Sequence, residues 1–238
     1  MITAIILSKD RPAQLDLLLG SGAKNTDQTW DVRIVRDNSG PGFENAIWRS
    51  LQKTKTDYTC FMCDDGILYR PITEHCLPMQ DEICFSLRLG DNTTVQYPTA
   101  MEQTPPEELV WNWTLHHDNG DFGYPGSIDG HIFRTADLIR MLDCKRFPNP
   151  TALECALVQG CEELADELPL MARARRSSYV GNPINRVSDQ SGVRYGTKYP
   201  ITAAECNRLY AAGQRIDIDA IDFTGVNGAH TEIELVWK

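Results

Sequence analysis

Two adjacent carboxylates at the end of an apolar run are the residues of this sequence best suited to chemistry. Residues 58–62 (YTCFM) are apolar and β-prone, with the length of a buried strand. Cys63 ends the run, and Asp64, Asp65 and Gly66 follow. Open α/β sheets bind ligands in the crevice beyond the carboxyl ends of their strands. Two acidic side chains there, with a glycine that permits a sharp exit, suit a divalent cation and a phosphate ester. An ordinary Asp-Gly turn is the alternative interpretation.

The elements before this pair predict how it is positioned. Residues 2–7 predict a buried first strand and residues 31–35 the next strand, with a helix from Pro12 between them and a helix over about 43–51 after them. This β-α-β-α-β order with short connections is typical of a parallel sheet with right-handed crossovers. All three strands end in polar or acidic residues, so we expect these residues to share one edge of the sheet.

The remaining chain predicts a less regular second half. We expect a loop at 91–106 and turns at 118–127, and Thr151 with Glu154 has the spacing of a helix capping box. No repeat or linker divides the chain, which favours a single α/β domain over residues 1–238. The expected strands are 83–89, 109–115, 128–133, 216–223 and 230–236, and the expected helices are 135–142, 151–164 and 202–212.

Composition narrows the class of protein. The 238 residues suffice for one well-buried α/β domain, and the start of the chain resembles neither a signal peptide nor a membrane span, so a cytoplasmic location is expected. Eight scattered cysteines then predict reduced thiols. Cys60 and Cys63 have C-x-x-C spacing, but they end a strand and lack a second ligand pair, which favours buried structural thiols over zinc or redox chemistry.

The charge is uneven. A net charge of −10 argues against a protein that coats nucleic acid non-specifically. Residues 172–198, however, carry six basic side chains and one acidic side chain, Asp189. This basic segment suits an anionic ligand, and a solvated loop is the alternative.

Several blocks, in their order, resemble GT-A type glycosyltransferases, which use nucleotide-sugar donors. The blocks span nearly the whole chain: ILSKDRPAQLDLLL, RDNSG, FMCDDGILYRP, PGSIDGHIFRTADL, NPTALE, PINRV and GAHTE. The resemblance implies a GT-A-like (Rossmann-like) single domain with a mainly parallel central sheet flanked by helices. It also implies a nucleotide-sugar-binding half over about 1–115 and an acceptor-binding half over about 116–238.

The resemblance also implies roles on the donor side. The acidic pair would hold Mn²⁺ or Mg²⁺ on the donor diphosphate, through Asp65, Asp64 and the late histidine His230. The family usually places its acidic residues two apart, whereas here Cys63 or Gly66 stands in one of those places, so Asp65 is the expected direct ligand. The nucleoside would be held by Ser8, Asp10, Arg11 and Asp37, and the diphosphate by Asp64, Arg186, Arg194 and Lys198.

On the acceptor side, the resemblance implies a catalytic base and contacts to the acceptor. Glu154 matches the acidic position that serves as base in many inverting members, and Asp129 is its rival. His131 and Arg134 are expected to contact acceptor or diphosphate. Trp113 could stack on a sugar, although core packing is its alternative role.

The expected function is therefore metal-dependent transfer of a sugar, with a UDP-sugar as donor, to a hydroxyl acceptor. A glycan, a small molecule and a hydroxymethylated base in phage-type DNA all remain open as acceptors. Nucleotidyl transfer is one alternative, but SKDRP lacks the glycines that such a loop requires. A catalytically inactive nucleotide-sugar-binding module is the other.

Overall fold

Seven strands form the central sheet of the computed structural model, which describes residues 1–26, 30–36, 40–72, 76–185 and 196–238. The first part has the expected order: β1 (Ile2–Leu7), α1 (Pro12–Asn25), β2 (Trp30–Val35), α2 (Gly40–Lys53) and β3 (Tyr58–Cys63). β1 pairs in parallel with both β2 and β3, and Leu7 lies opposite Val35 and Cys63. The prediction that the three strand ends share one edge is confirmed.

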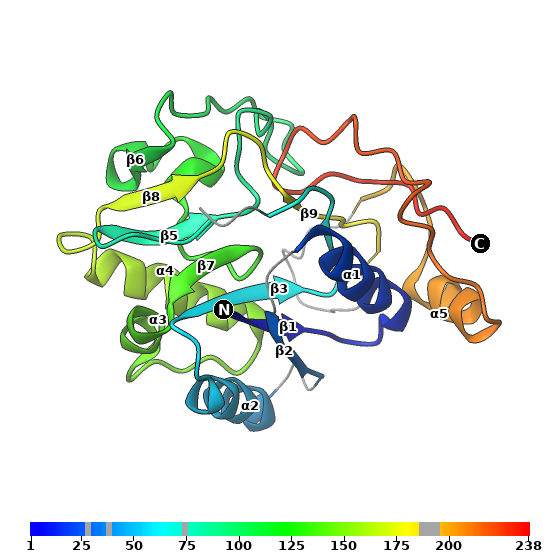
Figure 1. Cartoon of the computed structure of the whole chain (residues 1–238), viewed down its shortest axis with the longest axis horizontal. Helices are drawn as coiled ribbons and strands as arrows, with labels where there is room; N and C mark the ends of the chain where they lie inside the picture. The colour runs from blue at the N-terminus through cyan, green and yellow to red at the C-terminus, as the bar shows by residue number, and fades with distance from the viewer. Residues whose placement is uncertain (27–29, 37–39, 73–75, 186–195) are drawn as a thin grey trace.

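The sheet continues beyond β3 with strands from later in the chain (Figure 1). Its order is β2-β1-β3-β7-β5-β8-β6, with β7 (His131–Arg134), β5 (Glu82–Ser86), β8 (Leu170–Arg173) and β6 (Val110–Asn112). Only β7 and β6 run against the other strands. The expected α/β class with a mainly parallel sheet is confirmed. A second sheet pairs β4 (Gly66–Leu68), directly after the acidic pair, with β9 (Tyr179–Gly181).

Side-chain alternation along the strands buries both faces of the sheet. Ile5 and Phe61 pack in one core cluster with residues of α2, α3 (Thr135–Leu142) and α4 (Pro150–Glu163). Ile6 and Met62 pack in a second cluster with α1. A third cluster joins α1, β4 and β9 to α5 (Ala203–Ala211) and the C-terminal segment, which all lie on one side of the molecule in Figure 1.

The second half differs from the expectation in its strands. Only Val110–Asn112 of the predicted strand 109–115 is extended, because Asn112 accepts a hydrogen bond from the Thr114 amide and starts the 3-10 helix η1 (Trp113–His116). The predicted strand 128–133 begins only at His131. Segments 216–223 and 230–236 form no strand. They are held by the isolated bridges Ile216–Trp237 and Gly181–His230.

The prediction of reduced thiols is consistent with the structure. All eight cysteines are free. Cys60 is buried against the α1 side, while Cys63 packs against the cluster on the opposite face, so this C-x-x-C pair is not placed to form a disulfide. Within the described ranges, no helix combines the length and the apolar character needed to cross a membrane.

Candidate active site

Arg11 joins the loop after β1 to the acidic pair after β3. Its guanidinium forms ion pairs with Asp64, at 2.5 Å, and with Asp65, at 2.8 Å. Arg11 precedes Pro12, the first residue of α1, so the pairs bring the start of this helix to the end of β3. The side chain of Arg11 is 11% exposed, that of Asp65 is 20% exposed and that of Asp64 is fully buried. Asp65 is therefore the carboxylate that a ligand can reach.

Asp64 is held from several sides. Its Oδ2 accepts a hydrogen bond from the Lys9 amide at 2.9 Å, and the hydroxyl of Ser8 also donates to it. Burial raises the pKa of Asp64 to about 6, and the charge of Asp65 adds to this, although Arg11 lowers it. Asp64 thus fixes the shape of the β1 loop and depends on Arg11 for its charge.

A second polar group surrounds Asp129, which lies two residues before the start of β7, at the same edge of the sheet. Its carboxylate accepts hydrogen bonds from the Tyr179 hydroxyl and, at 3.0 Å, from Nε2 of His230. The Cys63 amide lies 3.5 Å from Oδ1. Burial alone would raise the pKa of Asp129, but His230, Arg88 and Tyr179 outweigh it and hold this pKa below its ordinary value. Asp129 is therefore an ionised carboxylate with both oxygens engaged.

Two glycines make room for this group. A Cβ on Gly66 would overlap the hydroxyl and ring of Tyr179. A Cβ on Gly181, opposite Gly66 in the small sheet, would lie 2.5 Å from Cδ2 of His230 and 2.8 Å from Oδ2 of Asp129. Gly66 of the acidic motif thus serves the close packing of Tyr179 against Asp129.

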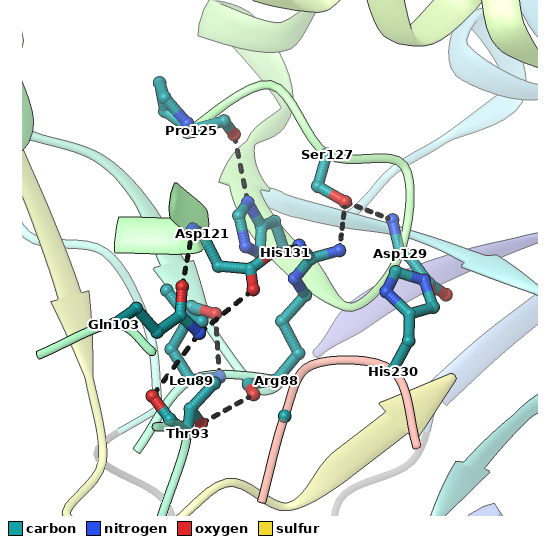
Figure 2. Close-up of polar contacts among 12 residues, drawn as sticks. Arg88, Leu89, Thr93, Gln103, Asp121, Pro125, Ser127, Asp129, His131 and His230 are labelled. Carbon is teal, nitrogen blue, oxygen red and sulfur yellow. Dashed lines mark hydrogen bonds and ion pairs between the residues drawn. The ribbon is translucent and has the colours of Figure 1, made fainter. Parts of the chain in front are cut away.

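Arg88 extends the polar group into the interior, as Figure 2 shows. It donates at 2.8 Å to the hydroxyl of Ser127, which in turn accepts from the Asp129 amide at 3.2 Å. Its other terminal nitrogen pairs with Asp121, and Gln103 donates to the second oxygen of Asp121 at 3.1 Å. This buried network fixes the turn that carries Asp129.

Glu154 lies half-buried on α4, close enough for its charge to interact with Asp129 and His230. Burial and the charge of Asp129 raise the pKa of Glu154, although Arg88, His230 and the Ile128 amide oppose this. The predicted capping box is wrong, because the side chain of Asn149 caps α4 by accepting from the Ala152 amide. Glu154 is therefore free of a capping role.

The structure divides the predicted site residues into two sets. The residues following β1 and β3 come together with Asp129, Glu154 and His230 at or just beyond one edge of the sheet. Asp10 is exposed there with a φ of 54°, and its carbonyl accepts from Asn207. Lys198 is exposed, and its amide donates to Glu232, two residues after His230. Asp37, Arg186 and Arg194 lie outside the described residues.

Three acceptor-side predictions are corrected. His131 is fully buried, with Nδ1 2.9 Å from the Pro125 carbonyl, and burial lowers its pKa to about 3. Arg134 lies opposite Tyr58, at the far end of β3, where it pairs with Asp137. Trp113 is 2% exposed and donates to the Leu168 carbonyl from the core. His131 and Trp113 thus present no surface to an acceptor, and Arg134 lies at the opposite end of β3 from the acidic pair.

The expected metal ligands do not assemble. The guanidinium of Arg11 is the cation between Asp64 and Asp65, and His230 faces Asp129 instead. Across the described part of the chain, no group of three or more His, Cys, Asp or Glu side chains is placed to hold a metal ion. This arrangement of the residues therefore does not fit the divalent cation that the sequence predicted.

Tyr179 and Arg88 are site residues that the sequence analysis missed. Arg88 carried a signal, because a charged residue inside the predicted strand 83–89 requires a buried partner. Tyr179 carried no such signal, because the segment that contains it, residues 172–198, was distinguished only by its basic residues. Arg173 from that segment is 2% exposed and pairs with Asp91 at 2.6 Å, so its charge serves the fold.

Comparisons with known proteins give remote similarities in structure alone. No protein-family model and no curated protein sequence matches the chain. Solved structures of S. aureus TarS are similar, one at 15% identity with a TM-score of 0.44, covering 75% of this chain and 36% of that one. A structure of TarS 1–349 gives 14% identity, a TM-score of 0.44 and coverages of 75% and 59%. TarS 1–349 in complex with UDP-GlcNAc gives 11% identity and a TM-score of 0.43, covering 89% of this chain and 65% of that one. The chain thus spans less than two thirds of each of these chains.

Proposed function

We propose that this protein is a glycosyltransferase that moves a sugar from a nucleoside diphosphate sugar, a UDP-sugar, to a hydroxyl acceptor. One observation carries the proposal. The Arg11–Asp64–Asp65 group and the Asp129–His230 pair lie at the same strand ends, and both contact the β3 terminus around Cys63. A charged group suited to a diphosphate thus adjoins a pair suited to proton transfer.

The donor side is assigned to the loop after β1. Arg11 presents a planar guanidinium, which matches phosphate oxygens in a bidentate manner, and the two carboxylates fix its orientation. Asp65, the more exposed carboxylate, can accept hydrogen bonds from hydroxyls of the ribose or the sugar. Ser8 and Asp10 border the nucleoside in this proposal. The Mn²⁺ or Mg²⁺ ion expected from the sequence stays a separate prediction.

The charge of the basic segment leaves the acceptor open between a glycan, a small molecule and a hydroxymethylated DNA base. A DNA acceptor requires cations that neutralise phosphates. Arg173 of this segment is already paired with Asp91, whereas Arg175 and Arg176 are exposed. Transfer to DNA would fall steeply between low and moderate salt, whereas transfer to a neutral acceptor would not.

A screen of UDP-sugars tests the proposal. Purified protein is incubated with each donor, with Mn²⁺ and separately with EDTA, and UDP release is measured alongside UDP binding by calorimetry. We expect one donor to be turned over and Arg11→Met to weaken UDP binding at least tenfold. Arg146→Met is the matched control, because Arg146 is exposed and pairs with Glu44 of α2.

The alternatives give other results in the same screen. Pyrophosphate release from a nucleoside triphosphate would indicate nucleotidyl transfer. Tight binding of a UDP-sugar without turnover under any condition would indicate an inactive binding module. Absence of both binding and turnover for every donor would contradict the proposal outright. Turnover that disappears in EDTA and returns with Mn²⁺ would show that a cation takes part despite the position of Arg11.

A further inference from the structure

A groove of about 620 Å³ between β2 and α2 is lined by cations, and no carboxylate is among its described lining residues. Its basic side chains are Arg33, Arg36, Arg49 and Lys53. The chain as a whole has 33 acidic and 23 basic residues, so this surface, the β2–α2 groove, separates positive charge from an acidic protein. Such a groove suits an anionic ligand.

Three of the four cations are available to a ligand. Arg36, Arg49 and Lys53 are exposed, and none of them forms an ion pair within the described part of the chain. Arg49 donates from Nε to the Asn45 carbonyl at 3.2 Å, one turn back along α2, and this contact leaves its charge uncompensated. The positive charge of the groove is therefore not used to hold the fold together.

Arg33 differs from these three, because it joins the two walls of the groove. Its guanidinium pairs with Asp31 at 2.6 Å and donates to the carbonyls of Ser50, at 2.5 Å, and Lys53, at 2.8 Å. These carbonyls belong to the last turn of α2, which is the negative end of the helix dipole. Arg33 compensates this negative end, so it does not repel an anion in the groove.

The α2 wall of the groove is one face of the helix. Positions spaced by three or four residues make up this face, namely Gly42, Ala46, Arg49 and Lys53. At about 1.5 Å per residue, the row is about 16 Å long. One strand of a DNA duplex carries a phosphate about every 3.4 Å along the axis, so the row spans about five phosphates.

One end of the groove adjoins the candidate active site. Val35 and Arg36 line the groove where β2 ends, and the Val35 carbonyl accepts from the Ser8 amide at 3.0 Å. Ser8 belongs to the loop after β1 that the proposed function assigns to the nucleoside. A polymer held in the groove therefore lies beside the same edge of the sheet.

We propose that the β2–α2 groove binds the phosphate backbone of DNA. Guanidinium groups match phosphate oxygens in a bidentate manner, and a lysine supplies a point charge. No aromatic side chain is among the described lining residues, so the groove offers bases no stacking surface. Binding is therefore independent of base sequence and sensitive to salt. Together with the proposed function, the groove favours DNA among the three acceptor classes; this choice of acceptor rests on that function, whereas the binding itself does not.

Fluorescence anisotropy with a labelled duplex of about 20 base pairs tests the binding. Three free cations predict that log K falls with log salt concentration with a slope of about −2.7, so the Kd should rise about 40-fold between about 50 and 200 mM NaCl. Arg49→Gln and Lys53→Gln should each weaken binding about tenfold at about 50 mM NaCl and reduce the slope by about 0.9. Duplexes of unrelated sequence should bind equally.

Arg208→Gln is the matched control, because Arg208 is exposed on α5, away from α2 (Figure 1), and its loss changes the net charge equally. It should leave the Kd within about twofold of wild type. Absence of duplex binding at low salt would overturn the proposal. So would a loss of binding in Arg175→Gln or Arg176→Gln in place of the groove variants, which would assign the DNA to the basic segment. Tighter binding of a heparin oligosaccharide than of the duplex would also overturn it, in favour of a sulfated glycan.

The outcome of this test is distinguishable from that of the UDP-sugar screen. DNA binding that depends on Arg49 and Lys53, with no turnover of any donor, would support the groove and contradict only the proposed function. Turnover of a UDP-sugar without DNA binding would support the proposed function and overturn the groove.

Discussion

Replacing Arg11 with methionine tests the electrostatics of the acidic pair most strongly. Asp64 is fully buried and Arg11 nearly so, and the ion pair of 2.5 Å is the main compensation for the charge of Asp64. Removing one partner of a buried ion pair costs about 3–5 kcal/mol, because the other charge is left uncompensated. We expect Arg11→Met to lower the free energy of unfolding by about 3 kcal/mol at pH 8.

The loss should depend on pH. The pKa of Asp64 is already raised to about 6, and without Arg11 it must rise further. A carboxyl whose folded pKa exceeds its unfolded pKa stabilises the fold below the unfolded pKa, and this stabilisation is lost as pH rises through the folded pKa. When the pH is lowered from 8 to 5, the free energy of unfolding of Arg11→Met should therefore rise relative to that of the wild type.

Urea unfolding at both pH values, followed by circular dichroism, measures these differences. The double variant Arg11→Met, Asp64→Asn should be more stable at pH 8 than Arg11→Met alone, because no unpaired charge remains. A loss below about 1 kcal/mol for Arg11→Met, or a loss independent of pH, would refute the reasoning.

Three further predictions concern side-chain packing. Gly66→Ala should destabilise the fold by about 1–3 kcal/mol in a urea titration, because its methyl group would overlap Tyr179. Gly20→Ala in α1 is the control, and it should be neutral or stabilising because the added methyl group meets open space. Trp113→Phe should lower the free energy of unfolding by about 1–3 kcal/mol, because it removes the hydrogen bond to the Leu168 carbonyl. The KM for the acceptor should stay unchanged, and a raised KM would show that Trp113 contacts the acceptor. Native protein should react with Ellman's reagent fastest at the exposed Cys144 and Cys155, and fast labelling of the buried Cys60 or Cys84 would contradict the described core.

The first half of the fold was predictable because local signals and topology agree there. Apolar runs of strand length, Pro12 at a helix start and short connections together specify β1-α1-β2-α2-β3. In the second half, side chains override the local pattern. The indole of Trp113 donates a hydrogen bond within the core. The alternating segment after Gly228 is bonded to Gly181 of β9 by isolated backbone hydrogen bonds and forms no regular strand.

The site was predictable in its parts and not in its pairings. The predicted strand ends place Asp64, Asp65 and Arg11 at one edge of the sheet, but the ion pairs of Arg11 with both carboxylates are seen only in the structure. His230 and Asp129 were both candidates, in different roles, because one sequence does not show that residues 101 positions apart share a hydrogen bond. Tyr179 joins them through the space left by two glycines, which no spacing in the sequence indicates.

A crystal structure of the chain with UDP tests the central claim most directly. We expect the uracil to lie beside the loop that carries Ser8 and Asp10, and the diphosphate to lie within ion-pair distance of Arg11. UDP bound at another edge of the sheet would contradict this account.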